Sequence, residues 1–199
     1  MPRQFAITWD YRCPYGRIAH DHVVAGLRAG ADWDVTFLPF CLGQSHVEEG
    51  DPDVWDVPET DSGLLALQVG VSVRDHFPAS FLDVHHALFE FRHVRGGNLR
   101  DRQALSAILA EAGLDPEVVF AHVDDGSALA TIRDEHTAYA RSHQVWGVPT
   151  FVVREHAVFV RLLDRADGDG AVATATVDRV LDQIDWPILN EFKHTSVPR

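Results

Sequence analysis

Alternating hydrophobic and polar positions at the start of the chain predict a strand, a helix and a second strand. In residues 4–9, large apolar side chains alternate with smaller or polar ones, as in a strand. The following helix begins near Pro14, because a first helical turn does not need the missing N–H, and it ends at about Gly30. The β-branched and aromatic run at 35–40 predicts the second strand. This order is a βαβ unit, which is expected to be parallel and right-handed.

Residues 44–143 have a different pattern, with helical periodicity and no strand. A polar, proline-rich loop extends to about residue 61, and five helical segments follow it. Their expected ranges are 62–77, 78–95, 101–112, 115–123 and 127–143. This part of the chain is therefore expected to be an all-helical insertion.

Strands return near the C-terminal end. Residues 149–153 and 157–160 are β-rich and separated by only three residues, which predicts a hairpin. A last helix is expected at 176–184. The predicted fold class is thus α/β, in which 1–43 and 144–199 form one β-α-β…β-β-α domain and 44–143 form the insertion.

Composition and charge exclude several classes of function. The chain of 199 residues is 46% hydrophobic and 24% charged, as expected for a soluble globular protein with one core. Its net charge of −13 argues against nucleic acid and anionic membranes as partners, since both need clustered positive charge. The chain has no run of about 18 apolar residues, so no membrane span is predicted. The first residues lack a signal-peptide pattern. We expect a cytoplasmic protein.

The candidate chemistry begins at Cys13, which follows the first predicted strand and directly precedes Pro14. Unpaired N–H groups at a helix N-terminus favour an anion, so we expect a lowered thiol pKa and a reactive thiolate. Arg12 and Arg17 add positive charge, which Asp10 opposes. A buried cysteine that only packs is the alternative interpretation.

A second candidate element is Gly147-Val148-Pro149-Thr150, at the head of the third predicted strand. Proline cannot donate a hydrogen bond within a sheet, so at a strand start it marks an edge or a special turn. A cis Val148–Pro149 bond would bend this loop sharply and expose the backbone groups beside it.

Taken together, these elements resemble the thioredoxin fold of the DsbA family over essentially the whole chain. The resemblance implies that Cys13 is the nucleophile and that Pro149 is cis and faces the sulfur. It also implies that the backbone around Val148 pairs with a bound peptide or thiol. We expect the substrate-binding residues to be Pro14, Tyr15, Trp146, Val148 and Pro149.

The chain departs from the family where a resolving cysteine is expected, because this position is Gly16. In one hypothesis Cys13 acts as a monothiol oxidoreductase, and a small thiol such as glutathione or mycothiol resolves its mixed disulfide. In another, Cys41 resolves it, since parallel strands one and two end at the same sheet edge. A buried structural role for Cys41 is the alternative.

Two further hypotheses leave redox chemistry. The fold also resembles kappa-class glutathione transferases and hydroxychromene-carboxylate isomerases. If this chain acts as they do, Cys13 would stabilise or replace the thiolate of a bound small thiol. In the other hypothesis, the protein is a non-catalytic binding module.

No metal or permanently bound cofactor is expected; the expected partner is a small thiol or a protein disulfide. A homodimer stays open, because the tail at 186–195 has enough apolar residues to dock on the domain or on a second chain.

Histidines and an acidic loop are the remaining candidates for chemistry. The spacing of His86, Glu90 and His93 places them on one helix face, but we expect a polar or packed face rather than a metal site. The loop at 164–170 resembles a calcium loop, yet it lacks the downstream glutamate. We expect it to be an acidic loop.

Overall fold

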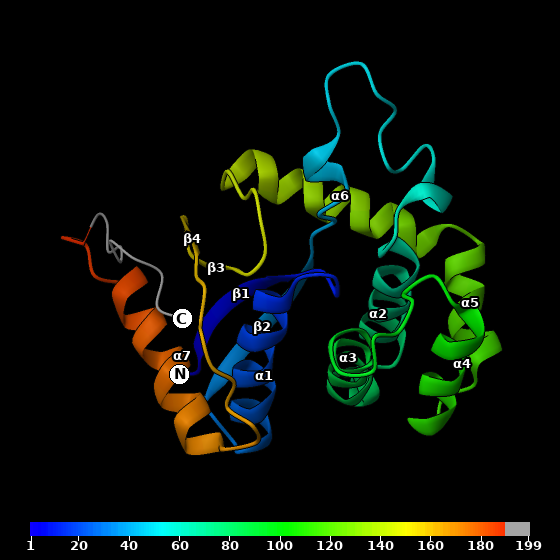
Figure 1. The fold of residues 1–199 in the computed structure, drawn as a ribbon. Coiled ribbons are helices and arrows are strands. Elements are labelled where there is room, and N and C mark those ends of the chain that lie inside the picture. The colour runs from blue at the N-terminus through cyan, green and yellow to red at the C-terminus, as the bar shows by residue number, and fades with distance from the viewer. Residues whose placement is uncertain (190–199) are drawn as a thin grey trace.

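In the part of the chain that the structure describes, the strands form a four-stranded mixed sheet with the order β2-β1-β3-β4 (Figure 1). A computed structural model describes residues 1–189. Strand β1 (Arg3–Trp9) pairs in parallel with β2 (Trp33–Pro39) and antiparallel with β3 (Thr150–Val153). Strand β4 (His156–Phe159) completes the hairpin with β3. The predicted β-α-β…β-β-α order is confirmed.

The two faces of the sheet belong to different apolar clusters. On β1, Phe5, Ile7 and Trp9 point into the main core, whereas Ala6 points into a smaller cluster that also contains Cys13. This division follows from the two-residue period of a strand. Helices α1 (Pro14–Arg28) and α7 (Gly170–Ile184) pack side by side and contribute to the main core (Figure 1).

Helix α7 begins six residues earlier than the sequence pattern predicts. The Asp169 side chain caps it by accepting hydrogen bonds from the amides of Ala171 and Val172, both at 3.0 Å. Its first residue, Gly170, packs so closely on Ala29 of α1 that an added Cβ would lie 2.3 Å from the Ala29 Cβ. The contact between the two helices therefore explains a glycine in a helical first turn.

The segment between β2 and β3 is helical, as predicted. Its five α-helices are α2 (Leu64–His76), α3 (Pro78–His93), α4 (Arg102–Glu111), α5 (Pro116–Asp124) and α6 (Ser127–Ser142). Two 3-10 turns, η1 (Gln44–His46) and η2 (Pro58–Thr60), precede them. Helix α6 runs from α5 back toward the sheet (Figure 1).

The helical segment shares its core with the sheet. Trp9 and Tyr11, from the end of β1, make aromatic contacts with Phe81, His85 and Phe89 of α3, and the apolar members of this group belong to one buried cluster. The insertion is thus packed directly behind the cysteine-bearing turn.

The C-terminal tail is described only in part. Trp186 and Ile188 are exposed, and residues 190–195 of the predicted docking segment lie outside the described residues. Of the helices within residues 1–189, none combines the length and hydrophobicity that a membrane span requires.

Candidate active site

Cys13 lies at the N-cap of α1 and faces the loop that precedes β3. Its sulfur accepts a hydrogen bond from the Gly16 amide at 3.3 Å, as an N-cap side chain does. The same sulfur lies 3.2 Å from the carbonyl oxygen of Val148, to which the thiol donates. The Val148–Pro149 peptide bond is cis. The structure thus brings together two elements that are 135 residues apart in the chain.

A buried threonine on β1 holds this loop in place. The Thr8 hydroxyl accepts from the Thr150 amide at 2.8 Å and donates to the Gly147 carbonyl at 3.1 Å. The Thr150 hydroxyl donates to the same carbonyl at 2.8 Å. Both threonines are buried, so these bonds are protected from water. The cis-proline loop is therefore fixed to the strand that leads into Cys13.

The turn before Cys13 is fixed by a buried ion-pair network. The guanidinium of Arg12 contacts Asp10 at 2.6 Å and Asp61, at the entrance to α2, at 2.9 Å. Asp10 also accepts from the Leu42 amide at 2.9 Å, just after β2. Gly63 leaves room for the arginine, because a Cβ there would lie 2.6 Å from its Nε. The network joins the turn to β2 and to the insertion.

This network changes the electrostatics expected from the sequence. Arg12 is occupied by two carboxylates, and Arg17 pairs with Glu90 at 2.7 Å, so the charges of both are already balanced. The arginine that lowers the pKa of the Cys13 thiol is instead Arg161, which follows β4.

The pKa expectation for Cys13 is corrected by the structure. Burial raises the pKa of the thiol, and Asp10 raises it further, while the amides of Gly16 and Tyr15 and the charge of Arg161 lower it by less. The side chain is only 8% exposed, and the Val148 carbonyl favours the protonated form. The helix terminus acts as predicted, but desolvation outweighs it. The resting state is therefore a thiol.

The predicted substrate-binding residues lie in different environments, and of these Tyr15 and Val148 belong to the apolar cluster of Cys13. Val148 and Pro149 are buried, and Pro14 is exposed. Tyr15 is half-buried, and the Cζ of Arg161 lies 3.7 Å from the centroid of its ring. Trp146 is 66% exposed and packs against Phe159, with ring centroids 4.6 Å apart.

Cys41 lies in a different environment from Cys13. It is fully buried in the main core cluster, whereas Cys13 belongs to the smaller cluster, and both cysteines are free. Burial and the nearby Asp10 and Asp61 raise the pKa of the Cys41 thiol to about 12. Its sulfur lies 3.9 Å from the Arg12 guanidinium. This environment favours a structural thiol.

A buried chain of hydrogen bonds behind the site was not predicted. Tyr11 bonds to His85 at 2.9 Å, His85 to His20 at 2.9 Å, and His20 to the Thr8 carbonyl at 3.0 Å. Because a carbonyl only accepts, His20 donates through Nε2, and His85 and Tyr11 must donate in the same direction. Burial lowers the pKa of His20 to about 4 and that of His85 well below its ordinary value. Both rings are therefore neutral.

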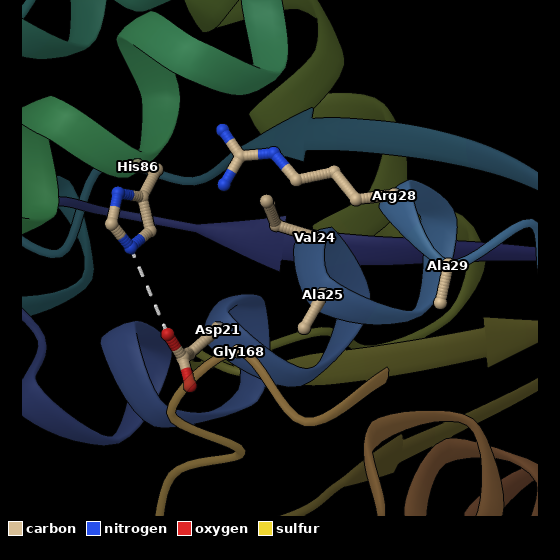
Figure 2. A pocket seen from close by; sticks show the side chains of 7 residues that line it. All are labelled: Asp21, Val24, Ala25, Arg28, Ala29, His86 and Gly168. Carbon is tan, nitrogen blue, oxygen red and sulfur yellow. Dashed lines mark ion pairs between the residues drawn. The ribbon is translucent and has the colours of Figure 1, made fainter. Parts of the chain in front are cut away.

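The histidines considered for a metal site have other partners. Asp21 and His86 face each other at 3.8 Å across a cleft of about 230 Å³ between α1, α3 and the loop before α7 (Figure 2). Glu90 binds Arg17, and His93 donates to the Tyr11 carbonyl. Within residues 1–189, no three His, Cys, Asp or Glu side chains are grouped so that they could hold a metal ion.

Comparison with known proteins identifies the architecture. Residues 7–168 match the family described as DSBA-like thioredoxin domain. A comparison with curated protein sequences gives no match.

Several solved structures share the fold at low sequence identity. A 2-hydroxychromene-2-carboxylate isomerase is 11% identical with a TM-score of 0.64, covering 90% of this chain and 96% of that one. The thiol-disulfide exchange protein α-DsbA2 from Wolbachia pipientis is 15% identical (TM-score 0.61; 92% and 81% covered). The cytosolic disulfide reductase DsbM from Pseudomonas aeruginosa, solved with GSH, is 18% identical (TM-score 0.60; 90% and 99% covered).

Proposed function

The chain belongs to the DSBA-like thioredoxin domain family, and we propose that it is a thiol–disulfide oxidoreductase with Cys13 as its single reactive thiol. The observation that carries this proposal is the position of the Cys13 sulfur, 3.2 Å from the carbonyl of Val148 at the cis-proline. A substrate disulfide bound along this loop is presented to the sulfur. Gly16 stands where a second cysteine would form an internal disulfide.

The proposed exchange has two balanced steps. The Cys13 thiol loses its proton to solvent. The resulting thiolate attacks one sulfur of a disulfide RSSR, so that a bond between the Cys13 Sγ and that sulfur forms and RS⁻ leaves. A small thiolate R′S⁻ then attacks the R sulfur, which releases the Cys13 thiolate and RSSR′. The net reaction replaces one thiol of the disulfide by another, and the protein is unchanged. Glutathione and mycothiol are the candidate small thiols.

Substrate binding supplies the activation that the resting site lacks. The raised pKa of Cys13 reflects burial, with its proton shared with the Val148 carbonyl. A substrate N–H that donates to this carbonyl takes the place of the thiol proton. The Gly16 amide, 3.3 Å from the sulfur, then remains as a donor to the thiolate. We therefore propose that the thiolate forms in the bound complex.

The test is mass spectrometry together with disulfide-exchange kinetics. Protein purified without reductant, or incubated with glutathione disulfide, is expected to carry an adduct on Cys13 that added thiol removes. Cys13→Ser and Cys13→Ala are both expected to abolish exchange, whereas Cys41→Ala, the matched cysteine control, leaves the rate of adduct release unchanged. A Cys13–Cys41 disulfide in place of the adduct would refute the monothiol mechanism.

A second candidate function is an isomerase or transferase that uses a bound small thiol. The protonated Cys13, whose S–H group donates to the Val148 carbonyl, favours it, because the same donor can turn to a bound thiolate. Cys13→Ser keeps a donor and Cys13→Ala removes it. Activity that survives in the serine variant and is lost in the alanine variant would support this function, and inactivity in both assays would favour a binding module.

A further inference from the structure

The position of Arg161 is set by the elements that form the site. The Val160 amide donates to the Pro149 carbonyl at 3.0 Å, so the chain leaving β4 runs beside the cis-proline. The next residue, Arg161, extends over the ring of Tyr15, with its Cζ 3.7 Å from the ring centroid. Tyr15 is two residues after Cys13. The guanidinium is therefore held over the ring of Tyr15, near enough to Cys13 for its charge to lower the pKa of the thiol.

Arg161 differs from other arginines near the site in having no anionic partner within residues 1–189. Arg12, Arg17 and Arg165 each contact a carboxylate at 3.1 Å or less. Arg161 is exposed and is supported by the aromatic face of Tyr15 instead. Stacking on a ring orders the guanidinium while leaving N–H groups free for a carboxylate.

The net negative charge of the protein makes the positive charge of Arg161 important for binding anions. With a net charge of −13, the protein repels anionic substrates at long range. The carboxylates of Asp10 and Asp61 share the single guanidinium of Arg12, so this group keeps a net negative charge near the turn. Within residues 1–189, the guanidinium of Arg161 over Tyr15 has no carboxylate partner, and it is therefore the feature that an anionic substrate would recognise.

We propose that Arg161, supported by Tyr15, is a specificity-determining residue that binds a carboxylate of the thiol or disulfide that reacts with Cys13. This inference rests on the proposed exchange function and adds no chemical step to it. It separates the two candidate thiols, because glutathione has two carboxylates and mycothiol has none. Arg161 thus selects a glutathione-type co-substrate.

The experiment compares two disulfides that differ only in their carboxylates. The rate of adduct formation on Cys13 is measured by peptide mass spectrometry with glutathione disulfide and with its tetraethyl ester. In Arg161→Gln we expect the ratio of the two rates to fall about fivefold, as for one exposed ion pair. Arg161→Lys should keep most of the wild-type ratio. The ratio is the proper readout, since the effect of Arg161 on the Cys13 pKa alters both rates together.

Two controls sharpen the result. Arg154→Gln removes an exposed arginine from the turn of the same hairpin, where it pairs with Asp185, and should leave the ratio unchanged. In about 1 M salt, where charge interactions are screened beyond roughly 3 Å, the wild-type ratio should approach that of Arg161→Gln.

The outcomes separate the inference from the function on which it rests. Adducts that form with both probes at the same ratio in wild type and Arg161→Gln would overturn the assignment of Arg161 alone. No Cys13 adduct with either probe would overturn the exchange function and the inference with it.

Discussion

A cysteine introduced at position 16 tests whether Gly16 is what prevents Cys13 from forming an internal disulfide. Gly16 lies within α1, where the backbone accepts any L-residue. We predict that Gly16→Cys closes an internal disulfide between Cys13 and the introduced thiol. The mixed disulfide would then be resolved within the chain and would no longer accumulate.

The structure gives the size of the perturbation. A Cβ at position 16 would lie 3.2 Å from the Cys13 Cβ and 3.0 Å from Val148 Cγ1. A relaxed disulfide separates its Cβ atoms by about 3.8 Å, so a movement of roughly 0.6 Å (3.8 − 3.2) forms the bond. Closing this four-residue loop stabilises the fold by about 2 kcal/mol, and crowding on Val148 costs about 1 kcal/mol. The oxidised variant should be about 1 kcal/mol more stable than wild type, and the reduced variant about 1 kcal/mol less stable.

The assay follows intact mass after addition of glutathione disulfide without free thiol. Wild type should accumulate a glutathione adduct on Cys13, whereas Gly16→Cys should lose two hydrogens and carry no adduct. Gly16→Ser is the matched control, because it crowds Val148 in the same way but has no thiol; it should accumulate the adduct. A Gly16→Cys protein that keeps the adduct as wild type does would refute the geometric reasoning.

The remaining predictions concern the groups that support the site. On lowering the pH from 7 to 4, the free energy of urea unfolding should fall by about 3 kcal/mol more in wild type than in His20→Gln. The reason is that folding lowers the pKa of His20 from 6.5 to about 4, so that this contribution to stability is lost as the pH falls below 6.5. The variant His156→Gln, which changes an exposed histidine, should behave as wild type. Thr8→Val should destabilise the fold by about 1–3 kcal/mol, since a buried amide loses its acceptor; an unchanged urea midpoint would contradict this. Gly63→Ala should lower Tm through its clash with Arg12, and an unchanged Tm would show that the arginine relocates freely.

Local features of the sequence were sufficient to predict the order of the helices and strands and the position of the Cys13 thiol. Strand alternation, proline at a first helical turn and glycine after a helix act over a few residues, so the order of elements could be predicted. The same applies to Cys13, which lies at the N-cap because strand β1 ends just before it and Pro14 begins α1. The start of α7 was missed because Gly170 is required by its contact with Ala29, which is distant in the chain.

The tertiary structure decided the charge state and the surroundings of the thiol. Helix position alone predicted a lowered pKa, but burial raises it, and the carbonyl of Val148, 135 residues away, accepts a hydrogen bond from the thiol. Packing likewise paired Arg12 with two carboxylates and, among the described residues, placed Arg161 on the ring of Tyr15 without a carboxylate partner. Desolvation and charge pairing depend on which distant groups meet, and no short-range pattern encodes these contacts. The sequence therefore determined where the Cys13 thiol lies, and the fold determined its protonation and the charged groups around it.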